Sequence, residues 1–220
     1  GNQYVTCAKQ LAAAYGVAID MPAGPSEVLV IADQFADPDF IAADLLSQAE
    51  HGPDSQVVLL TNSNQLPEAV LQRLSAQLEH LPRKNFAAQA LEHSLCIVFE
   101  TLEQCLKFSD SYAPEHLILN CSNARELADR VNNAGSVFVG PYTPESAGDY
   151  ASGTNHTLPT GGHARALSGV SVDSFTRFMT LQEITTAGLR ALGPVVQTMA
   201  EAEQLDAHAR AVTIRLNKLL

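Results

Sequence analysis

Residues 27–61 read EVLVIADQFADPDFIAADLLSQAEHGPDSQVVLLT. The first six and the last six residues are short apolar runs rich in Val, Leu and Ile, the pattern of strands that are buried on both faces. Between them, an Asp-Pro pair at residues 37–38 is typical of a helix start, and a Gly-Pro pair at residues 52–53 ends the helix. We therefore predict a strand–helix–strand unit with strands over residues 27–32 and 56–61.

The same alternation continues along the chain. Further strands are expected over residues 95–99, 116–120 and 136–139, and further helices over residues 67–81, 102–111 and 124–132. Continuously apolar strands separated by helices indicate a parallel sheet that is covered on both faces. We predict an α/β fold with a doubly wound, mostly parallel sheet, an incomplete Rossmann-like core, and a C-terminal helical arm.

The chain is expected to divide into three parts. Residues 1–25 form the end of a preceding domain, residues 26–170 the α/β core, and residues 171–220 the helical tail. A Gly193-Pro194 pair is expected to break the chain before a helix that starts at Val195. Residues 140–169 are rich in Gly and Pro, and we interpret them as a long functional loop.

Composition excludes several classes of protein. The net charge is −11, with 13 Lys and Arg against 24 Asp and Glu, which argues against nucleic acid or an anionic membrane as a partner. The apolar runs are far shorter than the roughly 20 residues that span a bilayer. The first residues are helix-like and do not resemble a signal peptide, so we expect a cytoplasmic protein.

The end of the first helix carries the first candidate site. Asp44, Gln48 and His51 lie three or four residues apart, so they share one face near the helix C-terminus. A carboxamide and an imidazole one turn apart can bind the same metal ion or polar ligand. The competing interpretation is a solvated face with an imidazole that favours the helix C-terminus.

This helix runs into a strand, and that conflicts with the usual location of ligands. In doubly wound sheets, ligands bind at the carboxyl ends of the strands. The C-terminus of this helix would lie at the opposite edge, and the sequence alone leaves the conflict open.

Glu115 and His116 are adjacent at the start of a predicted strand, behind a loop stiffened by Pro114. An acid beside an imidazole suits two separate proton transfers, because His titrates near neutrality and burial can raise the pKa of a Glu toward it. The alternative is a pair at the strand edge with no chemical role. Zinc would want N and O ligands such as His51, His208, Asp149 and the weaker Gln48, but their spacing is no evidence that they meet.

Several motifs together resemble the histidinol dehydrogenase family. They are the loop IDMPAGPSEVLVIAD, the segment SQAEHGPDSQ, the tetrapeptide PEHL, the stretch SVFVGPYTPESAGDYASGTNHTLPT and the closing LDAHARAVTIRLN. The resemblance implies a zinc enzyme that oxidises L-histidinol twice with NAD to give L-histidine, in histidine biosynthesis. It also implies that residues 1–25 are the end of an NAD-side Rossmann-like domain, and that the protein is a homodimer in which the helical tail is exchanged between subunits.

The resemblance further implies roles for individual residues. Glu115 and His116 match the acid–base pair, and Asn2 matches a contact to NAD. The zinc ligands are expected to be Gln48, His51, Asp149 and His208. Substrate contacts are expected from Ser26, Gln48, His51, His116, Asp149, Glu203 and His208.

The motifs correspond to the C-terminal half of the family's chain, so we expect most of the NAD site to be absent and the chain to be inactive alone. Two other classes stay open on the residues themselves. One is a zinc hydrolase, although no HExxH motif supports it. The other is a non-catalytic α/β interaction module whose polar loop binds a partner.

Overall fold

The computed structural model describes residues 3–219, so Asn2, the expected NAD contact, lies outside the described residues. Contacts divide the chain into two compact units, Gly1–Thr176 and Arg177–Leu220, and each is described by itself. The expected three-part division, with boundaries after residues 25 and 170, stays a prediction.

The first unit is built on a five-stranded parallel sheet with strand order β3-β2-β1-β4-β5. Its strands are β1 (Glu27–Ala32), β2 (Gln56–Thr61), β3 (Leu95–Val98), β4 (His116–Asn120) and β5 (Ser136–Val139). Because β1 and β4 are adjacent in register, Val28 lies opposite His116 and places the start of β4 beside the start of β1.

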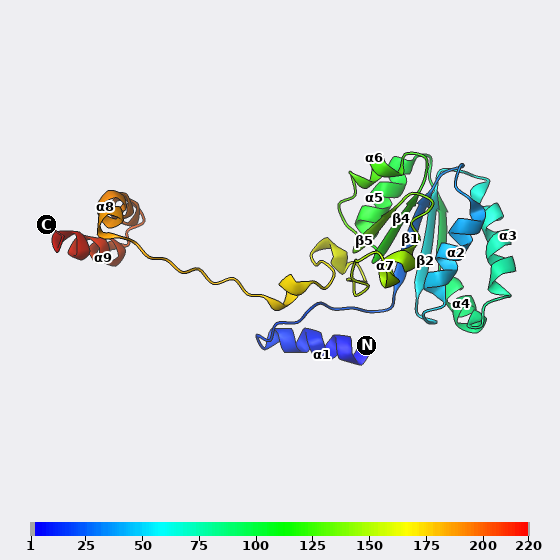
Figure 1. Cartoon of the computed structure of the whole chain (residues 1–220), viewed down its shortest axis with the longest axis horizontal. Coiled ribbons are helices and arrows are strands. Elements are labelled where there is room, and N and C mark those ends of the chain that lie inside the picture. Colours follow the sequence, from blue (N-terminus) through cyan, green and yellow to red (C-terminus); the bar gives the residue numbers. More distant parts are fainter. Residues whose placement is uncertain (1–2, 220) are drawn as a thin grey trace. The chain divides into compact units, whose positions relative to one another are not determined.

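Helices cover both faces of this sheet (Figure 1). Side chains alternate along β1, so that Val28 and Val30 point into one apolar cluster while Leu29 and Ile31 point into the other. One face is covered by α2 (Pro38–Ala49), α3 (Leu66–Leu78) and α4 (Lys84–Leu91), and the other by α5 (Leu102–Tyr112) and α6 (Ala124–Ala128). The predicted doubly wound α/β fold is confirmed.

Capping side chains fix the helices that lead to the site. The carboxylate of Asp37 accepts a hydrogen bond from the backbone N–H of Asp39 (2.8 Å) and starts α2. Thr101 and Gln104 form a capping box at the start of α5. This helix ends at Ala113, whose left-handed backbone (φ 57°) turns the chain through Pro114 into β4.

The segments before β1 and after β5 hold further structure. Helix α1 (Gln3–Ala14) is tied to the loop that follows it by an ion pair between Lys9 and Asp20 (2.7 Å). After β5, the stretch interpreted as a loop contains the short helix α7 (Glu145–Tyr150). Two 3-10 turns, His163–Arg165 and Val172–Phe175, follow it.

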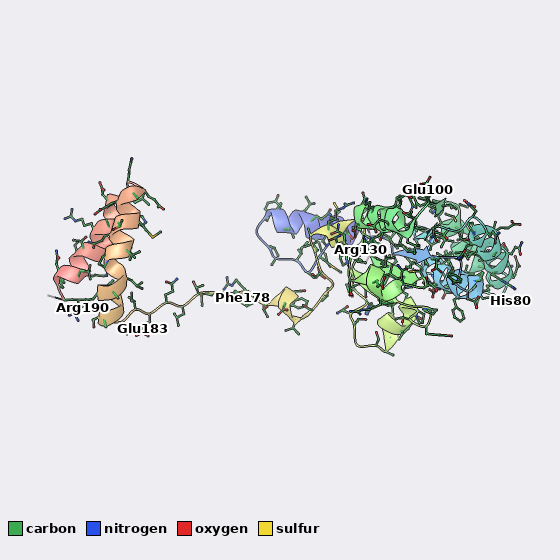
Figure 2. All side chains as sticks on the ribbon, turned by 90° about the horizontal axis from the view of Figure 1, so that it is seen from above. His80, Glu100, Arg130, Phe178, Glu183 and Arg190 are labelled. Atoms are coloured by element: carbon green, nitrogen blue, oxygen red, sulfur yellow. The ribbon has the colours of Figure 1, made fainter. Side chains whose placement is uncertain are left out.

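The second unit contains α8 (Thr186–Ala202) and α9 (Asp206–Asn217). Before α8 the chain is extended, and Figure 2 shows the side chains of Phe178 and Glu183 projecting from it. The predicted break at Gly193-Pro194 is wrong, because α8 continues through Pro194. Across residues 3–219, no helix combines the length and the apolar character needed to cross a membrane.

Packing between α8 and α9 explains this difference. A side chain added at Gly193 would come within 2.7 Å of Leu216, so this glycine permits the close approach of α9. The turn lies further on, at Gln204, whose backbone is left-handed (φ 60°).

Candidate functional site

Glu115 and His116 lie where α5 gives way to β4. Both side chains are buried, with 5% and 3% of their surface exposed. Gly135 passes so close that an added Cβ would lie 2.5 Å from the carbonyl oxygen of Glu115. Glu115 and His116, the expected acid–base pair, therefore lie in a tightly packed part of the core, at the amino edge of the sheet.

The backbone of Glu27 contacts both Glu115 and His116. Its N–H donates to Oε2 of Glu115 (2.9 Å), and its carbonyl oxygen lies 3.0 Å from Nδ1 of His116. Because a carbonyl can only accept, Nδ1 carries the proton and Nε2 keeps its lone pair. Nε2 is buried and has no hydrogen-bond partner among the described residues. This is the arrangement of an imidazole that is ready to accept a proton.

Burial shifts both groups toward their neutral forms. The pKa of Glu115 is raised to about 8, mainly by burial and also by the nearby Glu27 and Asp149 carboxylates, against a hydrogen bond from the Glu27 backbone that lowers it. Burial lowers the pKa of His116, although its bond to Glu27 and the charge of Asp149 act in the opposite sense. The pair, 3.6 Å apart, is therefore better described as neutral acid and neutral imidazole than as an ion pair.

The end of α2 reaches the same edge. Gln48 is fully buried at the last turn of the helix, and His51 follows it on an exposed turn before β2. Since β2 and β4 are parallel to β1, the entry to β2 and the entry to β4 lie at one edge. This answers the question left open by the sequence. The candidate site lies at the amino ends of the strands, and the expectation of ligands at their carboxyl ends does not apply to it.

Helix α7 supplies the remaining acids. A side chain added at Gly148 would come within 2.7 Å of the Phe138 ring, so the helix packs directly on β5. This contact places Oδ1 of Asp149 at 3.9 Å from Nε2 of His116. Ligand atoms of His51, Glu145 and Asp149 all lie within 4.8 Å of one another.

These donors fit a divalent cation. The pKa of Glu145 is raised to about 9, mainly by burial and also by the carboxylates of Asp149, Glu115 and Asp44. Burial also raises the pKa of Asp44 to about 7. Gathered acids of one sign favour a positive ion, and a set of imidazole, carboxylate and carboxamide donors suits zinc and other first-row metals.

A groove lies beside His51. It has a volume of about 860 Å³ and is lined by Ser26 and His51, together with Tyr4 of α1 and the turn at residues 52–55. The expected substrate contact Ser26 and the candidate metal ligand His51 thus face the same space. A polar ligand of amino-acid size fits within it.

Comparison with known proteins agrees with the motifs. The sequence model described as histidinol dehydrogenase matches residues 1–216. The chain belongs to the histidinol dehydrogenase family. It is 58% identical to the histidinol dehydrogenase of Bacteroides thetaiotaomicron over 219 residues, covering 100% of this chain and 51% of the relative. It is also 58% identical over 222 residues to the chloroplastic histidinol dehydrogenase of Arabidopsis thaliana, covering 100% of this chain and 48% of the relative.

A solved structure shows the same fold. The crystal structure of histidinol dehydrogenase from Elizabethkingia anophelis has a TM-score of 0.94 and 58% sequence identity, and the match covers 100% of this chain and 51% of that one. The chain therefore spans about half the length of the histidinol dehydrogenases that it matches.

The structure gathers most of the residues that the sequence singled out. Those brought to one edge of the sheet are Ser26, Gln48, His51, Glu115, His116 and Asp149. Glu203 and His208 belong to the other unit, where both are exposed. His80 lies on the surface just after α3 (Figure 2).

Sequence reasoning missed Glu145. It stands four residues before Asp149 on α7, so both acids share a helix face. The four-residue spacing is visible in the sequence. Because the sequence pattern predicts a loop there, the spacing does not predict a shared face.

Proposed function

We propose that this chain carries the metal-binding and acid–base residues of an NAD-dependent enzyme that oxidises L-histidinol to L-histidinal and then to L-histidine. Membership of the histidinol dehydrogenase family supports the proposal. The observation that carries it is the state of His116, whose Nδ1 is tied to Glu27 while the buried Nε2 is left as an open acceptor beside Asp149.

Zinc is the proposed metal. Gln48, His51 and Asp149 would hold it from the core, and His208 would be the fourth ligand. When bound, zinc supplies a positive charge that attracts the imidazole and amino nitrogens of the substrate and orients it. Ser26 lines the groove beside His51 and would contact the same substrate.

In the first oxidation, Nε2 of His116 accepts the hydroxyl proton of L-histidinol. The C–H bond of the alcohol carbon breaks with both of its electrons, and the carbonyl of L-histidinal forms. NAD is the proposed hydride acceptor, and its expected contact Asn2 lies outside the described residues. The imidazole suits this role because burial keeps it neutral, so it can take a proton near pH 7.

In the second oxidation, Glu115 takes a proton from water while the water oxygen bonds to the aldehyde carbon. The hydrate then loses its C–H hydrogen as hydride to a second NAD and a proton from oxygen, which leaves the carboxylate of L-histidine. A carboxyl group with a pKa near 8 is a stronger base than an ordinary glutamate and still ionises close to the working pH.

The tail has a proposed role of its own. We propose that Glu203 and His208 serve the site of a second copy of the chain in a homodimer with exchanged tails. Both residues are exposed around the turn between α8 and α9, so they are accessible to such a partner. The cytoplasmic location expected from the sequence stays a prediction.

The two half-reactions test the acid–base roles. Glu115→Gln is introduced into a histidinol dehydrogenase of family length that includes this chain, and NADH formation is measured from L-histidinol and from L-histidinal. We expect near-normal alcohol oxidation and aldehyde oxidation reduced by about 10²–10⁴-fold. The control is Glu126→Gln, an exposed glutamate of α6. Equal loss of both half-reactions would contradict the assigned roles.

A further inference from the structure

Gln48 has one amide orientation that satisfies its surroundings. In that orientation, Nε2 donates to Oε1 of Glu145 at 2.8 Å and to Oε2 at 3.1 Å. The carboxamide oxygen then points away from the Glu145 carboxylate, because oxygen and nitrogen leave the amide carbon in different directions. Oxygen is the atom of a carboxamide that binds a cation.

We propose that Glu145 is a positioning residue, which holds the Gln48 carboxamide with its oxygen available to the metal. The inference rests on the proposed function, in which Gln48 is a metal ligand. It assigns a purpose to a buried acid that the acid–base mechanism does not use.

The burial of both partners supports this role. Gln48 has no exposed surface and Glu145 has 2% exposed, so water cannot hold either group in place. A carboxamide alone can turn either end toward a metal ion, and the wrong end repels it. In its ionised form, which a cation in the site favours, the Glu145 carboxylate accepts hydrogen bonds but cannot donate them, so it binds the NH₂ end of Gln48. Partners of this kind orient metal ligands in many sites.

The residues around Glu145 explain why a carboxyl group lies at this buried position. Its Oε1 also lies 4.0 Å from Nδ1 of His116, and its oxygens lie near the ligand atoms of His51 and Asp149. Glu145 could therefore bind the metal directly, which is the competing role. The two roles differ in how Glu145 and Gln48 depend on each other.

A double-mutant cycle on the 220-residue chain separates these roles. Zn²⁺ affinity is measured by calorimetry for the wild type, Gln48→Ala, Glu145→Gln and the double variant, with Glu126→Gln as the exposed control. We expect each single change to weaken binding by about 10–100-fold. The double variant should bind no more weakly than Gln48→Ala alone, because Glu145 acts only through Gln48.

Three results would overturn the inference. If the fold losses of Zn²⁺ affinity from the two single changes multiply in the double variant, Glu145 is itself a metal ligand. A loss with Gln48→Ala but none with Glu145→Gln would remove the positioning role and leave the proposed metal site intact. Unchanged affinity in Gln48→Ala, or no Zn²⁺ binding by the wild type, would refute the proposed ligand set and the inference with it.

A second measurement does not depend on metal or on activity. In ¹⁵N-labelled wild-type chain without metal, the side-chain NH₂ protons of Gln48 should exchange slowly with solvent, because the carboxamide is buried and its nitrogen donates to Glu145. Exchange should accelerate in Glu145→Gln, while the backbone amides of β1 stay protected. Fast exchange of the Gln48 protons in the wild type would show that the pairing does not exist.

Discussion

The substitution Gly135→Ala tests how tightly the segment that carries Glu115 and His116 is packed. The N–H of Gly135 donates to the carbonyl oxygen of Pro114 (2.9 Å), and the next residue, Ser136, donates to that of Glu115 (2.9 Å). The entry to β5 is thus bonded to the segment that carries the pair. In Gly135→Ala, the new Cβ would lie 2.5 Å from the Glu115 oxygen and 3.2 Å from Cβ of Leu158.

The cost of this substitution follows from the overlap. Carbon and carbonyl oxygen in contact are normally about 3.3–3.6 Å apart, so the strands must separate by most of an ångström. The obstacle is backbone and cannot rotate away. Overpacking costs about 1–3 kcal/mol and weakening one of the bridging hydrogen bonds adds about 1 kcal/mol, so we expect unfolding free energy to fall by about 2–4 kcal/mol.

Urea unfolding followed by circular dichroism measures this loss. The midpoint should fall while the slope m stays unchanged. Gly52→Ala is the matched control, because an added Cβ there meets nothing within 4 Å. It should change stability by less than about 0.5 kcal/mol. A Gly135→Ala chain as stable as this control would refute the reasoning.

Other substitutions test separate parts of the fold. Burial raises the pKa of Asp44 from 3.8 to about 7. The protonated carboxyl therefore makes its full contribution to the free energy of unfolding below pH 3.8, and this contribution is lost as the pH rises through 7. Asp44→Asn should therefore match the wild type in urea near pH 4 and exceed it by roughly 1–3 kcal/mol at pH 8. Thr101→Ala removes a capping box and should cost about 1 kcal/mol in urea unfolding, whereas Gln65→Ala, at a helix start with no side-chain cap, should cost almost nothing. Leu117→Ala empties a fully buried site and should lower the unfolding free energy by about 2–5 kcal/mol.

The sheet was predictable because its chemistry is local. The interior positions of β1, β2 and β4 are buried and continuously apolar, and the bounds of these strands and of β5 are those expected from the sequence. The edge strand β3 is one residue shorter than expected. The backbone N–H of Phe99, the next residue, still donates to the carbonyl oxygen of Thr61 at the end of β2 (2.8 Å).

The missed elements depend on packing between distant segments. Helix α7 has only six residues, in a stretch rich in Gly and Pro, and it is held by contact between Gly148 and Phe138. Nothing in its own apolar pattern indicates a helix. The Gly193-Pro194 pair predicts a break before a helix at Val195, but both residues lie inside α8, which packs against α9 with Gly193 close to Leu216.

In the candidate site too, features that depend on local sequence were predictable, and features that depend on contacts between distant segments were not. The sequence singled out Gln48, His51, Glu115, His116 and Asp149 through short motifs and the family resemblance. It could not show that the Glu27 peptide fixes the proton on Nδ1 of His116, because that contact joins the starts of two strands 89 residues apart.

The most direct test of the proposed site is metal content and L-histidinol binding on the 220-residue chain. Zinc is measured by elemental analysis and substrate by calorimetry, for the wild type, His51→Ala and the surface control His80→Ala. We predict about one zinc ion per chain and measurable L-histidinol binding for the wild type and the control, and loss of both in His51→Ala. Zinc and substrate binding that survive in His51→Ala, or that are absent from the wild type, would contradict the account.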